Sequence, residues 1–253
     1  MSAVHDTNKA CCSIPPVQSD YKSKGSYQKV GQFDKAYVVG DSKTHALICI
    51  YDIFGFFPQT EQGSDIVSQA LSGTKVIMPD FLQGKPWPED NFPPKTDEDK
   101  QKLQEFFGTT ANVGDRLAEL KSVASTLKSE GYTHISLYGF CWGGKVATVA
   151  AGEKDLFKSV AIVHPAMLDV KDVNGIEVPF GFYPSKDEPS DTIKEFQEAL
   201  SKKAFADKND YKHYENMHHG WAAARADLKD PENKKAFEDV YGRLATFFGS
   251  NNQ

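Results

Sequence analysis

Short apolar runs alternate along the chain with longer segments whose apolar residues recur at helical spacing. Residues 46–51 form a continuous apolar run, and residues 75–78 form a shorter run that is apolar after Lys75, a pattern typical of strands covered on both faces. Strands that alternate with helices over this length indicate an α/β protein with a mostly parallel, doubly wound sheet and flanking helices. The same periodicities predict two short strands within 27–39, strands at 134–138, 159–163, 178–183 and 211–214, and helices at 58–71, 97–107, 113–129, 145–151, 191–205 and 231–248.

Two segments lie outside this alternation. Residues 1–25 contain prolines and polar residues without a sustained period and are predicted to be an N-terminal arm, which leaves residues 26–253 as a single domain. Residues 81–94 are rich in proline and aromatic residues and keep neither a helical nor a strand period. A loop of this length in a compact domain is usually functional or mobile, so we expect it to form one wall of a pocket. A plain packed loop is the alternative.

The composition excludes several classes of protein. The 253 residues are 40% hydrophobic, enough to bury a core, which excludes disordered and collagen-like classes. The formal net charge of −6 repels phosphate backbones, so no nucleic-acid partner is expected. No run approaches the roughly 20 apolar residues that span a bilayer. Because the first residues also lack a secretory signal, we expect a cytoplasmic protein without a membrane partner.

The cysteines indicate neither a secreted nor a metal-binding protein. The four, Cys11, Cys12, Cys49 and Cys141, are too few and too scattered for a disulfide framework. They form no Cys-x-x-Cys pair or Cys/His cluster, so neither a metal nor a cofactor is expected. The adjacent Cys11 and Cys12 lie in the predicted arm, where an untethered or merely packed pair is expected.

One of these cysteines lies in a nucleophile-elbow pattern. Gly139-Phe-Cys-Trp-Gly143 has cysteine in the position of serine, between a predicted strand and a small-residue helix. The turn strains its central residue, so the flanking positions must be almost free of side chains, as glycine provides. A thiol attacks as thiolate, and the helix that begins after Cys141 supplies positive potential. Cys141 is therefore predicted to be a nucleophile; a cysteine that only packs the turn is the alternative.

A thiol nucleophile also needs a base, which we predict to be His219. This histidine follows the last predicted strand, where a loop can aim it at the carboxyl edge of the sheet. Gly220 directly after it favours His219, and the neighbouring His218 is the alternative.

The chain order nucleophile, acid, histidine of α/β-hydrolases requires an acid between residues 141 and 219. Asp187 lies shortly after the predicted strand 178–183, where a carboxylate can reach the outer imidazole nitrogen. Asp187 is the predicted acid, and Asp169 and Asp172 after the previous strand are the alternatives.

Four motifs in sequence order resemble the dienelactone hydrolase (carboxymethylenebutenolidase) family: Asp52-Ile-Phe-Gly55, Met78-Pro-Asp-Phe81, Gly139-Phe-Cys-Trp-Gly-Gly144 and His218-His-Gly-Trp221. The N-terminal Cys11-Cys12 with Pro15-Pro16 and Tyr21 is similar to the fungal branch of that family. The resemblance extends over essentially the whole chain. It implies an α/β-hydrolase fold and a catalytic triad of Cys141, Asp187 and His219.

The resemblance also implies the surroundings of the nucleophile. The backbone N–H groups of Ile53 and Trp142 are implied to form an oxyanion hole, which stabilises the charge that develops on the substrate oxygen. Asp52 stands where the family places an acid in contact with the resting thiol. The bacterial type holds a substrate carboxylate with arginines, and Arg225 is the candidate here. Trp87 and Phe140 are further candidates for substrate contacts.

These observations predict a hydrolase of small ester or lactone substrates that works through a Cys-His-Asp triad and an acyl-enzyme. Cys141 attacks the carbonyl carbon, His219 accepts the thiol proton and later activates water, and Asp187 orients the imidazole. The alternative is a non-catalytic α/β-hydrolase-fold protein that binds a small ligand or a partner chain. A thiol redox protein would need a resolving cysteine nearby, which the sequence lacks.

Overall fold

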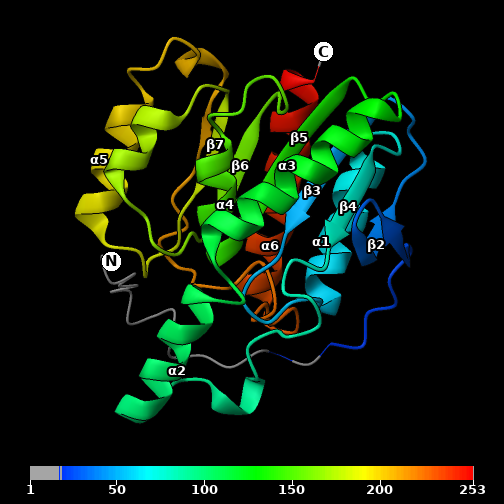
Figure 1. The fold of residues 1–253 in the computed structure, drawn as a ribbon. Coiled ribbons are helices and arrows are strands. Elements are labelled where there is room, and N and C mark those ends of the chain that lie inside the picture. Colours follow the sequence, from blue (N-terminus) through cyan, green and yellow to red (C-terminus); the bar gives the residue numbers. More distant parts are fainter. Residues whose placement is uncertain (1–16, 18, 253) are drawn as a thin grey trace.

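The computed structural model describes Val17 and residues 19–252. Within them, eight strands form one sheet in the order β1-β2-β4-β3-β5-β6-β7-β8 (Figure 1). Strand β2 is antiparallel to β1 and β4, and all other neighbours are parallel. This topology confirms the predicted fold class. The strands are β1 (Ser26–Val30), β2 (Phe33–Val39), β3 (His45–Ile50), β4 (Lys75–Pro79), β5 (His134–Phe140), β6 (Val160–Val163), β7 (Phe180–Tyr183) and β8 (Asp210–Tyr211).

Helices cover both faces of the sheet. Helices α1 and α6 contact each other behind the sheet, whereas α3 and α4 contact each other in front of it (Figure 1). The connections explain this division, because right-handed crossovers that run in opposite directions along a sheet place their helices on opposite faces. The helices are α1 (Pro58–Ala70), α2 (Asp97–Gly108), α3 (Val113–Ser129), α4 (Trp142–Ala150), α5 (Ser190–Leu200) and α6 (Pro231–Asn251), with short 3₁₀ helices η2 (Glu89–Asn91), η3 (Val170–Gly175) and η4 (Ala206–Lys208).

The structure differs from the predicted elements at several points. Helix α4 begins three residues before its predicted start at 145, and β7 begins two residues after its predicted start at 178. The last strand is only Asp210–Tyr211, not 211–214, and Tyr214 makes an isolated bridge with Ser185. Pro184 lies between these pairings and has no N–H to donate, so the ladder cannot continue. Helix α5 ends at Leu200, its last buried apolar residue, five residues before the predicted end. Residues 170–175, predicted as loop, form η3.

The predicted division of the chain stays a prediction. All strands and helices of the described residues lie within 26–253, the range assigned to a single domain. Most of the predicted arm, including Cys11 and Cys12, lies outside the described residues. The described part of the arm bonds to the body of the protein: Val17 N donates to Ala224 O at 2.9 Å, and Gln59 Nε2 donates to Val17 O at 2.6 Å.

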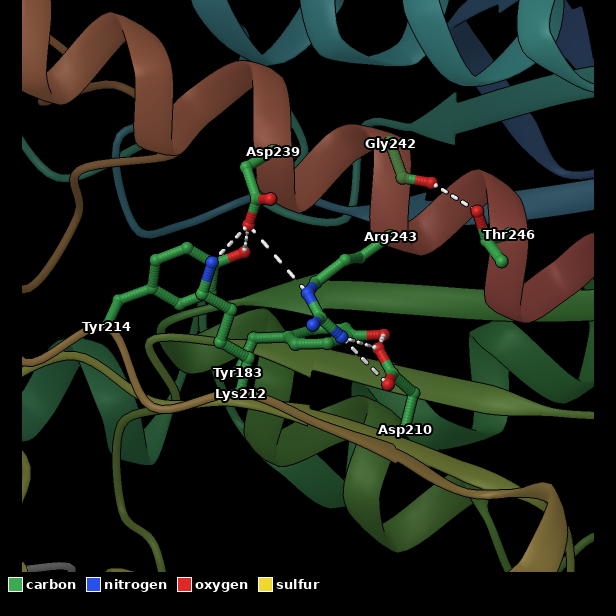
Figure 2. Close-up of polar contacts among 8 residues, drawn as sticks. All are labelled: Tyr183, Asp210, Lys212, Tyr214, Asp239, Gly242, Arg243 and Thr246. Atoms are coloured by element: carbon green, nitrogen blue, oxygen red, sulfur yellow. Dashed lines mark hydrogen bonds and ion pairs between the residues drawn. The ribbon is translucent and has the colours of Figure 1, made fainter.

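A polar network fastens the short strand β8 and the residues after it to helix α6 (Figure 2). Arg243 on α6 donates through Nη1 to both carboxylate oxygens of Asp210 at 2.8 Å. One turn earlier on α6, Asp239 accepts from Tyr214 Oη at 2.6 Å and from Lys212 Nζ at 2.8 Å. The network thereby holds the chain that leaves β8 against α6.

We expect Arg243→Met to lower the free energy of unfolding by about 1 kcal/mol, because the Arg243 and Asp210 side chains keep about a third of their surface in water. Urea denaturation followed by circular dichroism measures the change. Lys100→Met removes the more exposed Lys100–Asp97 pair and is the matched control, with no measurable change expected. Equal losses in the two variants would show that the network contributes nothing specific.

Candidate active site

The winding of the sheet reverses between β3 and β5. From β3 the chain passes to β4 on one side, then crosses back over β3 to form β5 on its other side. Ligands of such sheets bind at the carboxyl ends of the strands where the winding reverses. Asp52 and Ile53 follow β3 there, and Cys141 follows β5. The predicted nucleophile and one predicted oxyanion donor therefore come from neighbouring strand ends.

Cys141 has the strained backbone of an elbow, with φ 53° and ψ −119°, directly before helix α4. The glycines on either side permit this turn because, without a side chain, they let other backbone atoms approach closely. A Cβ atom on Gly139 would lie 2.2 Å from Gly143 O, and one on Gly143 would lie 2.4 Å from Ile50 O. Both contacts are with backbone, which cannot move aside. The turn therefore requires glycine at both positions.

Both described cysteines are buried, but Cys141 follows the carboxyl end of β5, whereas Cys49 lies within β3. Cys141 is 1% exposed, and its main chain is bonded to the β6 segment: Cys141 N donates to Val163 O at 3.2 Å, and Ala166 N donates to Cys141 O at 2.9 Å. Cys49 lies inside β3, where burial raises the pKa of its thiol to about 12. A thiol with that pKa stays protonated and is a poor nucleophile.

His219 is fully buried, and its ring is held by Glu188. The His219 Nδ1 atom lies 2.7 Å from Glu188 Oε1. A carboxylate only accepts, so Nδ1 carries the proton and Nε2 is the basic nitrogen. Ser185 holds the carboxylate in turn, since its Oγ donates to Glu188 Oε1 at 3.0 Å and its backbone N donates to Glu188 Oε2.

The contact predicted between Asp187 and the imidazole is not the one that the structure shows. Asp187 Oδ2 accepts from the backbone N of His219 at 2.7 Å, so Asp187 fixes the main chain and Glu188 fixes the ring. The two acids are adjacent in the turn before α5, and chain order cannot choose between them. Bonds from Ser185 turn the longer glutamate side chain inward.

The side chains of His218, Asp169 and Asp172 bond to partners away from the His219 ring. His218 Nε2 lies 3.2 Å from the carbonyl oxygen of Arg225. Asp169 caps η3 by accepting from a backbone N–H group, and Asp172 pairs with a lysine of α4. Of the two neighbouring histidines, His219 is thus the one whose ring bonds a buried carboxylate.

Hydrogen bonds hold both residues that carry the predicted oxyanion donors, Trp142 and Ile53. Trp142 is the first residue of α4, where backbone N–H groups have no partner within the helix, and its indole Nε1 donates to Ala111 O at 2.8 Å. Ile53 follows β3, and its carbonyl accepts from Trp87 N at 2.8 Å. The loop 81–94 is thereby fastened to the loop after β3, and its predicted place as a pocket wall stays a prediction.

Asp52 is buried, and its carboxylate organises the loop after β3. Oδ1 accepts from Phe54 N at 2.9 Å and Oδ2 from Ala224 N at 3.3 Å. Burial raises the pKa of this carboxyl group, and the positive charge of Arg225 and the two N–H donors offset part of the rise. Asp52 thus joins the loop after β3 to the loop after His219, while its predicted contact with the resting thiol stays a prediction.

Arg225 is buried between aromatic rings. Its guanidinium carbon lies 4.6 Å from the ring centre of Phe92 and 5.1 Å from that of Phe54, and Nη1 donates to His219 O at 3.3 Å. The rings attract the cation and shield it from water. Gly220 makes room for it, because a Cβ there would lie 2.7 Å from Arg225 Cδ. Arg225, on the loop after His219, therefore contacts both the loop after β3 and the loop 81–94.

Phe140, predicted to contact substrate, packs beneath the site instead. Its ring centre lies 5.7 Å from that of Tyr138, 6.0 Å from Tyr241 and 5.6 Å from His164, all buried. In an elbow the residue before the nucleophile still belongs to the strand, and its side chain points into the core. This packing does not support a substrate contact for Phe140.

Sequence reasoning missed two buried residues beside the predicted base, Glu188 and His164. Glu188 gave no signal beyond its position next to Asp187. His164 directly follows β6, and Asp52 lies two residues after the end of β3; that position at the carboxyl edge of a parallel sheet is the signal that was available. The His164 ring centre lies 5.0 Å from that of His219.

Neither a metal cluster nor a membrane span is found in the described part of the chain. There, no group of three or more His, Cys, Asp or Glu side chains is placed to hold a metal ion. No helix among the described residues is both long and apolar enough to cross a membrane.

The sheet order and the elbow after β5 define an α/β-hydrolase fold, and the comparisons identify the family. The sequence model of the dienelactone hydrolase family matches residues 35–251, so the chain belongs to this family. An uncharacterized AIM2 family protein of Schizosaccharomyces pombe is 37% identical over 217 residues, which cover 85% of this chain and 86% of that protein. The predicted membership, with its fungal branch, is confirmed.

More distant relatives agree with this assignment. The carboxymethylenebutenolidase homolog of Homo sapiens is 25% identical over 205 residues, 79% of each chain. The solved structure of a dienelactone hydrolase from Anabaena variabilis matches with a TM-score of 0.64 at 13% identity and covers 93% of this chain and 100% of that chain. The structural likeness concerns the fold alone. The family and the fold together indicate a hydrolase that acts on a small molecule.

Proposed function

We propose that this protein hydrolyses small carboxylic esters or lactones through a thioester on Cys141. The observation that carries the proposal is the buried bond between His219 Nδ1 and Glu188 Oε1, at the strand edge where Cys141 occupies a strained elbow. A carboxylate that fixes one imidazole nitrogen leaves the other as a base, which is what a thiol nucleophile needs. A binding protein requires neither the strain nor the oriented base.

The first half of the reaction forms the thioester. His219 Nε2 takes the proton from Cys141 Sγ, and the sulfur attacks the carbonyl carbon of the substrate. The carbonyl oxygen becomes an oxyanion, which the N–H groups of Ile53 and Trp142 stabilise. The carbon–oxygen bond to the leaving group then breaks, and the leaving alkoxide takes the proton from His219. In a lactone the leaving group stays attached to the acyl part.

The second half returns the enzyme to its resting state. A water molecule gives a proton to His219 Nε2 and attacks the thioester carbon, forming a carbon–oxygen bond. The carbon–sulfur bond breaks, and the thiolate recovers its proton from His219. The products are the carboxylic acid and free Cys141.

In this proposal the two acids next to each other have different tasks. Glu188 fixes the tautomer of His219 and stabilises the imidazolium that forms twice per cycle. Asp187, the acid that the family resemblance implies, holds the His219 backbone by a charged hydrogen bond. Ring and main chain of the base are thus held by separate carboxylates.

The substrate we propose is small and carries a polar or negatively charged group. Cys141 and His219 are nearly or fully buried, so a large substrate has no room to reach them. Arg225 supplies a cation among aromatic rings, and Trp87, 6% exposed, closes the wall next to Ile53. Arg225 and Trp87 are the proposed substrate contacts.

Cys141→Ala should reduce hydrolysis of 4-nitrophenyl acetate to the rate without enzyme, because no nucleophile remains. Cys141→Ser should also be far slower than the wild type, since a hydroxyl is a weaker nucleophile than a thiol. Release of 4-nitrophenolate is followed at 405 nm, with thermal melting as the check on folding. A folded alanine variant with near wild-type activity would rule out the covalent mechanism.

The two histidines form a matched pair for testing the base. His219→Asn should lower kcat/KM by about 10²- to 10⁴-fold, the usual contribution of a general base. His218→Asn should stay within about tenfold of the wild type, since it loses one hydrogen bond of roughly 1 kcal/mol outside the reaction. The reverse order would assign the base to His218.

The two acids allow an equally direct comparison. Glu188→Gln should lower kcat about 10²-fold or more, because the amide no longer enforces the Nδ1–H tautomer. Asp187→Asn should cost less than about tenfold, because an amide oxygen still accepts the bond from His219 N. A larger loss in Asp187→Asn would restore Asp187 as the orienting acid. Steady-state kinetics on 4-nitrophenyl acetate distinguishes the two results.

A further inference from the structure

His164 lies directly beside the elbow but has no part in the mechanism described so far. It follows β6, and residues close to it in the chain bind the main chain of Cys141. Val163 O, directly before His164, accepts from Cys141 N, and Ala166 N, two residues after it, donates to Cys141 O. His164 N donates to Tyr183 O at 2.9 Å, and its φ is 36°. Few non-glycine residues adopt a positive φ, and such residues cluster at functional sites.

The His164 ring is enclosed by three rings of the site. Its centre lies 5.0 Å from that of His219, 5.6 Å from Phe140 and 6.4 Å from Trp221. His164 is 0% exposed, and among the described residues neither of its ring nitrogens has a hydrogen-bond partner. The indole Nε1 of Trp221 is likewise unpartnered in this part of the structure. A buried polar group left unpaired costs about 1 to 3 kcal/mol, so this corner is suited to bind a polar ligand.

The charge state of His164 indicates which kind of ligand its ring can bind. Burial, together with the positive potential of His219 and Arg225, lowers the pKa of His164 well below its ordinary value, so the ring is neutral at pH 7. A neutral imidazole has one donor and one acceptor nitrogen and offers no charge to a carboxylate. Water matches either nitrogen, since it both donates and accepts.

The proposed hydrolysis requires a bound water at this place. The water that attacks the thioester must touch His219 Nε2, which takes its proton, and a buried water normally has two or more polar partners. His164 is the neighbouring side chain with nitrogens available for a second contact. Acylation uses the thiol as nucleophile and needs no such water.

We propose that His164 positions the hydrolytic water by hydrogen bonding to it while His219 acts as the base. This inference rests on the proposed function. In the step, the water oxygen forms a bond to the thioester carbon, one water proton passes to His219 Nε2, and the carbon–sulfur bond breaks. His164 keeps its proton state throughout and contributes only the hydrogen bond that orients the water. His164 therefore acts in deacylation and not in acylation.

The test compares His164→Phe with His164→Asn, using 4-nitrophenyl acetate. Phenylalanine keeps a planar ring but cannot hydrogen bond, and we expect kcat to fall roughly 10- to 100-fold, the value of one or two hydrogen bonds. KM should fall in proportion, so that kcat/KM, which reports acylation, is unchanged. The first turnover should still release one equivalent of 4-nitrophenolate as a burst. Asparagine tolerates positive φ and keeps a polar group, so His164→Asn should recover most of kcat.

Hydroxylamine provides an independent measure of the same step. It is a stronger nucleophile than water, so it should accelerate turnover of His164→Phe more than that of the wild type. His164→Ala gives the same comparison without added volume if the phenylalanine variant does not fold.

Three results would overturn the role of His164. In folded variants these are an unchanged kcat, a parallel loss of kcat and kcat/KM, or a rise of KM at constant kcat, the last indicating a substrate contact. Failure of the proposed function has a different signature, because Cys141→Ala would then hydrolyse the ester as fast as the wild type.

Discussion

The close contact between the elbow and the end of β3 is the constraint on which the site depends. Gly143 lies so near the carbonyl oxygens of Ile50 and Tyr51 that a Cβ would approach them to 2.4 and 2.5 Å. This contact brings the turn after β5 against the end of β3, from which the loop with Asp52 and Ile53 begins. Cys141, the central residue of the turn, has positive φ. The strained residue proposed as nucleophile and the strand end that precedes the proposed oxyanion donor Ile53 are thus linked by packing of backbone on backbone.

The loop that carries His219, the proposed base, is held by contacts with α6. Tyr241 Oη donates to Ala222 O at 2.9 Å, and Asn233 Nδ2 donates to Trp221 O at 2.8 Å. Both donors are buried side chains of the last helix, which packs on α1 behind the sheet. Tyr241 fits closely there, because a Cβ on Gly63 of α1 would lie 1.8 Å from its ring. The position of the loop that carries His219 therefore depends on the packing of α6, the next helix in the chain, against α1, which is far from it in sequence.

The sequence was sufficient for the fold and for the residues that lie in motifs. The apolar run 46–51 and the shorter one that follows Lys75 predicted buried parallel strands, because strands covered on both faces need no polar positions. The elbow at Cys141 was predictable because its glycines, the strand before it and the helix after it are contiguous in the sequence. A sequence displays such contiguous patterns directly.

The remainder depends on contacts between distant segments. Asp187 and Glu188 are equivalent in sequence, and only the bonds from Ser185 and to His219 show which carboxylate faces the ring. His164 belongs to no motif, and the role proposed for it follows from two ring nitrogens without a partner among the described residues, inside a ring cluster formed by β5, β6 and the loop that carries His219. The early end of β8 depends on Pro184, which follows the neighbouring strand β7. In each case the deciding partner lies elsewhere in the chain.

The central claim is that the substrate acyl group becomes attached to Cys141, and rapid acid quenching tests it directly. The enzyme is mixed with excess 4-nitrophenyl acetate, quenched within milliseconds, digested and analysed by mass spectrometry. The account predicts one acetyl group on the peptide that contains Cys141, removable by hydroxylamine as a thioester and absent from Cys141→Ala. Turnover with no acetyl group on that peptide, or with the group on another residue, would contradict it.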